Sequence, residues 1–291
     1  MIDYDTLFCF VDDFCQSFCV WWEKRLLEGY RKKKLRNRST HLTLSEILTI
    51  MIAYHESGYR CFKDYYRFVL SHHRLEFPRL VSYERFVVLM KRSLPGVVML
   101  FAVLRGEATD ILFADSTPYV VCKAVRRYTH KVFEGLAALS KNSVGGFYGL
   151  KLHFVFNATG SIVRLRITPG NVDDRKGLKG ILSGLTGKIF GDRGYLGKSF
   201  FEDLWKQGLQ RVTRLRKNMK NKLMELWERF YWDKRMTIES IFSSLKSCGT
   251  FEHSRHRNIG NAFCHIFTAL IAYQIRPTKP TFKDNLKKIK I

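Results

Sequence analysis

The segment Ile111-Leu112-Phe113-Ala114-Asp115 decides the fold of this chain, because a run of four apolar residues ends there in a carboxylate. A short apolar run of this kind is typical of a buried strand. The segment Lys188-Ile189-Phe190-Gly191-Asp192 repeats the pattern. Two such strands lying side by side would place both aspartates at one edge of a sheet. Taken singly, each aspartate fits a turn equally well, because Asp favours turns and helix caps.

A third acidic residue, Glu239, falls on a segment with helical spacing. The apolar stripe that would anchor this helix has i, i+3, i+4, i+7 spacing and consists of Ile238, Ile241, Phe242 and Leu245. Arg235 lies four residues before Glu239, and Lys246 lies seven residues after it. This spacing also suits an ion pair on a helix surface, which contributes only a few tenths of a kcal/mol. The spacing alone favours the ion pair.

The charge of the chain indicates an anionic partner. The 291 residues include 50 Lys and Arg against 26 Asp and Glu, which gives a net charge of +24. Such an excess is larger than solubility requires, and nucleic acid is the first candidate partner. A membrane surface is the second candidate, weakened because we find no apolar run near 18 residues. We expect no membrane association.

The cysteines and the N-terminus indicate a reducing compartment. Seven cysteines with no CxxC pair argue against a disulfide framework and against a zinc ribbon. The set Cys248, His253, His256 and Cys264 has the spacing C-x4-H-x2-H-x7-C, which matches no standard zinc site. No basic segment followed by an apolar one, as in a secretory signal, stands at the N-terminus. We therefore expect a cytoplasmic, nucleoid-associated protein.

The first 105 residues are expected to be entirely helical. Thr43 and Glu46 form the pattern of a capping box before an apolar stretch. A later helix is expected to begin at Ser82 and to end at Pro95-Gly96. The basic run 31–38 fits either a solvated linker or a DNA contact, and we favour the contact slightly.

Strand patterns replace helical ones after Thr109. The segments 149–156 and 162–167 alternate apolar and polar residues around the turn Asn157-Ala158-Thr159-Gly160, which predicts a hairpin. His153 is predicted to point away from the apolar face, either near the site or into solvent. Asp173-Asp174 follow Pro169-Gly170, and we favour a helix N-cap over a metal ligand for this pair. The order of the elements predicts a mixed sheet covered by helices.

Several motifs in order resemble the DDE transposases of bacterial insertion sequences, and in particular the insertion sequence 982 family. The segments that carry this resemblance are Phe113-Ala114-Asp115-Ser116-Thr117-Pro118, Tyr148-Gly149-Leu150-Lys151-Leu152-His153, Thr168-Pro169-Gly170-Asn171-Val172-Asp173-Asp174, Gly191-Asp192-Arg193-Gly194-Tyr195 and Ile238-Glu239-Ser240 through Leu245-Lys246. Shorter matches, such as Leu44-Ser45-Glu46 and Glu252-His253-Ser254, extend the resemblance over nearly the whole chain.

The resemblance implies an α/β fold of the ribonuclease-H-like, retroviral-integrase-like type. Its mixed sheet with flanking helices would occupy residues 106–276, after an all-helical N-terminal domain, 1–105, for DNA-end binding. A basic, loosely held tail, 277–291, would follow. The resemblance assigns Asp115, Asp192 and Glu239 as catalytic residues and as ligands of two Mg²⁺ ions, for which Mn²⁺ can substitute. Hydrolysis at the transposon end, followed by attack of the freed 3′-hydroxyl on target DNA, is the implied reaction.

The resemblance also implies a set of contacts with double-stranded DNA, both transposon ends and target. Members of this broad class show Tyr, Arg, Glu and Lys around the third acid, and here Trp232 stands in the Tyr position. Basic residues expected to bind DNA, from this signature and from basic loops, are Arg235, Lys246, Arg193, Arg216, Lys217, Lys220, Arg126 and Arg127. A homodimer or a larger assembly on DNA is expected, because two ends must be brought together.

Two other functions remain compatible with the sequence. A DNA-binding protein without catalysis would share the basic charge, but carboxylates in a phosphate-facing groove would repel its ligand. A structure-specific nuclease of the same fold would cleave DNA without joining it.

Overall fold

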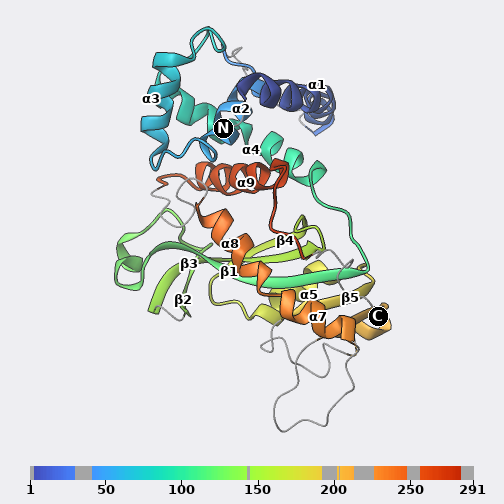
Figure 1. Ribbon diagram of the computed structural model, residues 1–291. Helices are drawn as coiled ribbons and strands as arrows, with labels where there is room; N and C mark the ends of the chain where they lie inside the picture. Colours follow the sequence, from blue (N-terminus) through green and yellow to red (C-terminus); the bar gives the residue numbers. More distant parts are fainter. Residues whose placement is uncertain are drawn as a thin grey trace. The chain divides into compact units, whose positions relative to one another are not determined.

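The computed structural model describes residues 3–29, 41–142, 145–191, 202, 204–212, 226–247 and 256–282, and for residues 26–29, 211, 226, 227 and 229 it describes the backbone alone. The chain divides into two compact units, each built from two stretches of sequence. Unit 1 comprises Met1–Leu104 and Ser247–Ile275, and unit 2 comprises Arg105–Lys246 and Arg276–Ile291. Figure 1 shows the described helices and strands in sequence colours.

Unit 1 is helical, as predicted for the N-terminal region. Its helices are α1 (Tyr4–Gly29), α2 (Leu44–Tyr54), α3 (Phe62–His72), α4 (Tyr83–Val103) and α9 (Ile259–Ile275). The capping box that starts α2 is confirmed, because the Glu46 backbone N–H donates to Thr43 Oγ1 at 3.1 Å and the Thr43 N–H donates to a Glu46 carboxylate oxygen at 2.6 Å.

The predicted end of α4 at Pro95-Gly96 is wrong. The helix continues through Pro95 to Val103. The residues after the proline, Val97 and Leu100 among them, are buried, and this burial offsets the roughly 3 kcal/mol that a proline costs inside a helix. Helix α4 is long and apolar enough to cross a membrane, which corrects the expectation that the chain has no apolar run near 18 residues. The core helix of a globular unit can have the same length and composition.

Helix α9 belongs to unit 1 although it is the last helix described in the chain. It is buried almost all round, and it packs against α4 and α2. Cys264 donates to the Met90 carbonyl at 3.0 Å, and Thr268 lies 2.9 Å from His55 Nε2. A helix that is apolar on every side requires neighbours on every side. The division therefore differs from the predicted domain that ends at residue 276.

Unit 2 contains a mixed sheet. Its described strands are β1 (Ile111–Lys123), β2 (Ala138–Asn142), β3 (Gly145–Asn157), β4 (Ile162–Pro169), β5 (Gly187–Gly191) and β6 (Leu209–Val212). The order is β2-β3-β1-β5-β6, with β4 paired to β3 beside β2. Its helices are η1 (Ala124–Thr129), α5 (Asp174–Leu182), α7 (Leu226–Lys234) and α8 (Thr237–Ser247). The predicted α/β class, a mixed sheet with flanking helices, is confirmed.

Strand β1 organises the sheet. It pairs antiparallel with β3 along its length and parallel with β5 from Ile111 to Ala114. The predicted β3–β4 hairpin is confirmed, and its turn closes with the Gly160 N–H donating to the Asn157 carbonyl at 3.0 Å. Gly160 has a φ of 77°, which favours glycine there. The interpretation of Asp115 as the last residue of a short strand is wrong, because β1 continues to Lys123.

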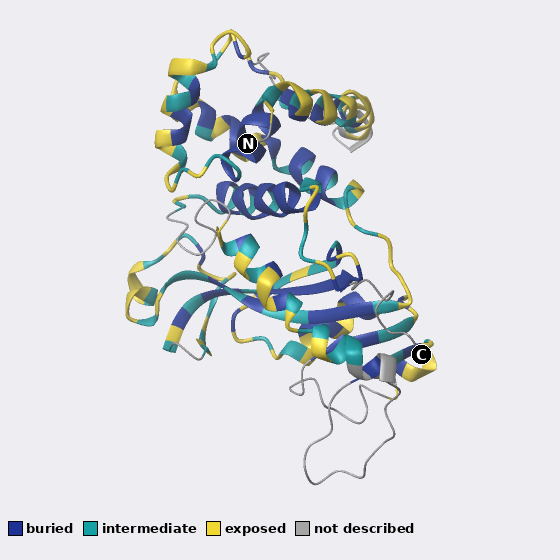
Figure 2. Cartoon of the chain, in the orientation of Figure 1, coloured by how far each residue is buried: buried dark blue, intermediate teal, exposed yellow. Residues whose placement is uncertain are grey.

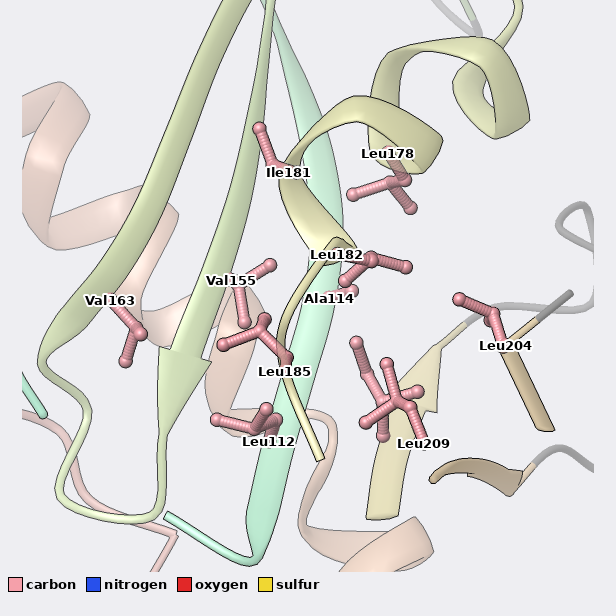
Figure 3. Close-up of a cluster of buried hydrophobic side chains, with 11 residues drawn as sticks. Leu112, Ala114, Val155, Val163, Leu178, Ile181, Leu182, Leu185, Leu204 and Leu209 are labelled. Atoms are coloured by element: carbon pink, nitrogen blue, oxygen red, sulfur yellow. The ribbon is translucent and has the colours of Figure 1, made fainter. Parts of the chain in front are cut away.

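The two faces of the sheet have different coverings. On the face that we call the back, α5 contributes Leu178, Ile181 and Leu182 to a cluster with Leu112, Ala114 and Val155 (Figure 3). On the front face, ring contacts join Phe113 and Phe190 to Tyr231 of α7, and Phe154 and Phe156 to Phe242 of α8. Figure 2 shows the buried centre of the sheet between these coverings. Alternation along β1 therefore sends Phe113 and Asp115 to the front, and Ala114 and Ser116 to the back.

The segment after α9 is anchored as far as Phe282. This residue is fully buried, its ring stacks on Phe113 with centroids 3.7 Å apart, and its N–H donates to the Ala158 carbonyl at 3.0 Å. The prediction of a loosely held tail from residue 277 is thus wrong for its first residues, because an aromatic residue finds an apolar position on the sheet.

Candidate active site

Asp115 lies on the front face of the central strand. It pairs with Phe154 of β3, and its neighbour Ala114 pairs with Gly191, the last residue of β5. Its side chain is 19% exposed. The apolar residues that precede it in β1 bury this part of the strand, so the carboxylate is supported by a rigid part of the fold. A site on such an element is held more precisely than one on a loop.

Both oxygens of the Asp115 carboxylate have a defined partner. The backbone N–H of Ser116 donates to Oδ1 at 2.8 Å. Arg235 Nη2 lies 3.6 Å from Oδ2 and forms an ion pair with it. A carboxylate in a partly desolvated position requires such positive compensation. The arrangement fixes the orientation of the Asp115 carboxylate.

Arg235 occupies the junction between α7 and α8. Its N–H donates to the Trp232 carbonyl at 3.1 Å, and its carbonyl accepts from the Ile238 N–H at 2.9 Å. The guanidinium also lies over the Trp232 ring, 5.7 Å from the centroid. Trp232 stands in the position where we expected Tyr, and its ring supports the guanidinium by a cation–π contact.

Glu239 lies in the first turn of α8 and is exposed. The predicted stripe of this helix is confirmed, because Ile238, Ile241 and Leu245 are buried and Phe242 packs on the phenylalanines of β3. Glu239 follows Arg235, the residue that contacts Asp115, by four positions in the sequence. No ion pair joins Glu239 to a residue that the structure describes. The ion pair seen for Arg235 goes to Asp115 instead. Lys246 is half-buried in the last turn of α8.

Several predicted site residues lie outside the described residues. Asp192 follows Gly191 in the sequence and is the most important of them. The others are Arg193, Arg216, Lys217 and Lys220, together with Cys248 and His253 of the zinc alternative.

Arg126 and Arg127 are described, but at a distance from Asp115. They lie in η1, beyond the far end of β1, and the eight residue steps from Asp115 to Lys123 span roughly 26 Å. The Arg127 guanidinium stacks over the Tyr128 ring at 4.3 Å, and the side chains of Val125 and Tyr128 are largely exposed. The structure therefore does not bring these arginines to the carboxylate.

The structure confirms the predicted role of Asp173 and contradicts the predicted position of His153. Asp173 is the N-cap of α5, as predicted, and accepts from the Arg175 N–H at 2.9 Å. The Arg175 side chain lowers the pKa of Asp173 to about 2 by hydrogen bonding. His153 is fully buried on the back face, so the prediction of an outward position is wrong. Burial lowers its pKa to about 4.

The residues present suit a hard divalent cation in chemical type. Asp115 and Glu239 supply carboxylate oxygens, which Mg²⁺ prefers and which zinc ribbons do not use. Within the described ranges no group of three His, Cys, Asp or Glu forms a metal site, and Asp192 lies outside those ranges.

Comparison with known structures finds distant likenesses to Mos1 proteins. A pre-cleavage Mos1 transpososome is 10% identical, with a TM-score of 0.29, over 89% of this chain and 84% of that one. A Mos1 strand transfer complex is 10% identical, with a TM-score of 0.24, over 82% and 88%. Among curated proteins nothing matches.

The family comparison is more direct. A family model described as "Transposase DDE domain" matches residues 105–259, which is more than half of the chain and includes β1, the α7–α8 junction and Glu239. With an aspartate on the central strand, a glutamate on a helix that packs on the same face and a match of this extent, the chain belongs to the DDE transposases.

Proposed function

We propose that this transposase binds the terminal inverted repeats of an insertion sequence of the 982 family, cuts the DNA at the element boundary and transfers the freed strand to target DNA. The observation that carries the proposal is the setting of Asp115. Its carboxylate is held on the central strand by the Ser116 N–H and by Arg235, which stands four residues before Glu239 in the sequence.

Asp115, Asp192 and Glu239 are proposed to hold two Mg²⁺ ions, with Mn²⁺ as a substitute. When bound, the two ions would activate the attacking oxygen and stabilise the leaving oxygen. The protein's part is to orient the carboxylates. Asp115 is oriented by the hydrogen bond at 2.8 Å, and Glu239 by the buried stripe that fixes α8 on the sheet.

Arg235 and Lys246 are proposed to hold DNA phosphates near the carboxylates. A guanidinium has five N–H donors in a fixed fork, and a single carboxylate oxygen does not occupy all of them. Arg235 is therefore suited to bind Asp115 and a phosphate together. The same role, farther from the carboxylates, is proposed for Arg126, Arg127, Arg193, Arg216, Lys217 and Lys220. The net charge of +24 supports a polyphosphate ligand of this size.

A labelled terminal-repeat duplex tests the proposal. Incubation with Mg²⁺ or Mn²⁺ should give nicks at the element boundary and joined products with a second duplex. Asp115→Asn, Asp192→Asn and Glu239→Gln should each abolish both products and leave binding of the repeat largely intact. Normal cleavage by any of the three variants contradicts the assignment of that residue.

The other two functions predict different products in the same experiment. A DNA-binding protein without catalysis would shift the duplex and leave it intact with either metal. A structure-specific nuclease would give nicks without joined products. The carboxylates favour catalysis over binding alone, because they repel phosphates unless cations balance them.

The assembly and location of the protein are further proposals. Two transposon ends have to be held together for coordinated transfer, so we propose a homodimer or larger assembly on DNA, within the cytoplasm and at the nucleoid. Light scattering with and without paired terminal-repeat duplexes tests the assembly. A complex with one chain per two ends would contradict it.

A further inference from the structure

Three motifs from separate parts of the sequence meet on the back face of the sheet, behind Asp115. Ser116 follows Asp115 in β1, Lys151 and His153 lie in β3, and Asp174 opens α5. Asp174 Oδ1 is the centre of the group. It accepts from Ser116 Oγ at 2.8 Å, lies 3.1 Å from Lys151 Nζ, and lies 3.8 Å from His153 Nδ1.

Ser116 connects this group to the candidate active site. Its backbone N–H donates to Asp115 Oδ1 on the front, and its hydroxyl donates to Asp174 Oδ1 on the back, each at 2.8 Å. Successive strand residues point to opposite faces, so one residue can contact both. Any rotation or shift of β1 at Ser116 would change both hydrogen bonds. The geometry thus couples the orientation of the Asp115 carboxylate to Asp174.

The surroundings hold Asp174 in one place. Lys151 Nζ also donates to the Val172 carbonyl at 3.2 Å, which ties the segment before α5 to β3. His153 is fully buried, its Nε2 lies 2.9 Å from Thr168 Oγ1, and α5 approaches its ring so closely that only glycine fits at position 177. Burial keeps this histidine neutral near pH 7. The network therefore contains one carboxylate and one cation.

Asp173, the neighbour of Asp174, has none of these contacts with β1. It caps α5 and pairs with Arg175 at 3.0 Å. The two adjacent aspartates thus have separate roles, and one serves as a matched control for the other.

We propose that Asp174 is a positioning residue of the active site, which acts through Ser116 to hold the Asp115 carboxylate in the orientation that metal binding requires. The metal in this proposal rests on the proposed function, whereas the contacts among Asp115, Ser116 and Asp174 do not. Partners of this kind, behind a metal ligand, usually contribute about 10- to 100-fold to metal affinity or activity.

Asp174→Ala, Ser116→Ala and Asp173→Ala test the proposal in the full chain. Electron paramagnetic resonance measures the affinity for Mn²⁺. This affinity should fall about 10- to 100-fold in Asp174→Ala and Ser116→Ala, and it should remain unchanged in Asp173→Ala. The double variant Ser116→Ala/Asp174→Ala should be no weaker than either single one, because both remove the same hydrogen bond. Asp174→Asn keeps an acceptor for the Ser116 hydroxyl and should bind Mn²⁺ closer to the wild type.

A second readout does not depend on metal or DNA. Hydrogen–deuterium exchange of a peptide that contains Ser116 should be about tenfold faster in Asp174→Ala than in Asp173→Ala, because the Ser116 N–H loses its fixed carboxylate partner. Circular dichroism confirms that both variants are folded. Equal exchange and equal Mn²⁺ binding in these two variants would overturn the proposal, as would additive losses in the double variant or an Asp174→Asn as defective as Asp174→Ala.

The outcomes separate this proposal from the proposed function. If the wild-type chain neither cuts terminal-repeat DNA nor binds Mn²⁺, the proposed function fails. The exchange rates of the Ser116 peptide then still decide whether Asp174 positions Asp115.

Discussion

Two glycines of α5 should respond in opposite ways to the same substitution. Gly177 is buried and faces His153, whereas Gly180 is exposed and faces the end of Arg166. A methyl group added at Gly177 would lie 2.5 Å from His153 Nδ1 and nearer still to Cε1 and Nε2. A methyl group at Gly180 would meet the guanidinium of Arg166, with Cζ at 3.0 Å. Both positions are helical, so alanine has the same intrinsic advantage at each.

The expected free energies of unfolding follow from what each neighbour can do. Alanine in place of glycine stabilises a helix interior by about 0.5–1 kcal/mol. At Gly177 the buried ring has to move, which costs about 1–3 kcal/mol, and the loss of its hydrogen bond to Thr168 costs about 1 kcal/mol more. We expect Gly177→Ala to destabilise the protein by about 2 kcal/mol. At Gly180 the arginine can move into solvent, so Gly180→Ala should stabilise by about 0.5 kcal/mol.

Urea unfolding of the two variants measures this difference. The transition of unit 2 should move to lower urea in Gly177→Ala and to slightly higher urea in Gly180→Ala. Since His153 belongs to the network behind Asp115, Gly177→Ala should also weaken Mn²⁺ binding at urea-free conditions. Equal stability of the two variants would refute the reasoning, because it would mean that the His153 ring is not packed against α5.

Three other predictions concern stability and pH. Glu228 is 8% exposed and lies 2.7 Å from Lys188 Nζ. Lys188→Met removes this cation and should lower the free energy of unfolding, measured in urea, by about 1–3 kcal/mol. Lys188→Met/Glu228→Leu should recover part of the loss. Burial lowers the pKa of His153 to about 4, so its contribution to stability is fully present above pH 6.5 and is lost as pH falls toward 4. The free energy of unfolding should therefore depend less on pH in His153→Gln. An unchanged slope would contradict the assignment. Thr43→Ala removes the cap of α2 and should cost about 1 kcal/mol in thermal unfolding.

Local rules were sufficient where sequence neighbours decide the structure. The capping box at Thr43 and the hairpin turn at Gly160 follow from residues three apart, and both are confirmed. The assignment of Asp115 to a buried strand on a mixed sheet also follows from local pattern. The length of that strand does not follow from the local pattern. Ser116-Thr117-Pro118 has the composition of a turn, but β1 continues through these residues because they pair with Lys151 to His153 of β3.

The back-face network could not be predicted for a different reason. Its members are up to 58 residues apart in sequence, as for Ser116 and Asp174, and only the packing of α5 on β3 joins them. His153 alternates with apolar residues, which indicates an exposed side chain when one face of a strand is solvated. Here both faces are covered, so the alternation separates two buried environments rather than core and solvent. The Asp192 prediction lies outside the described residues and stays a prediction.

The discontinuity of unit 1 has a consequence for protein synthesis. Helix α9 supplies a buried layer for α2 and α4, yet it is translated after the whole of the sheet. Helices α2 and α4 therefore emerge from the ribosome before the helix that packs on them. About 150 further residues follow α4 before α9 is made, at a synthesis rate of about 5–20 residues per second. A reading frame interrupted within unit 2 would yield a product with neither unit complete. Fragments of such a gene should therefore give rapidly degraded chains rather than partial proteins that compete for the same DNA.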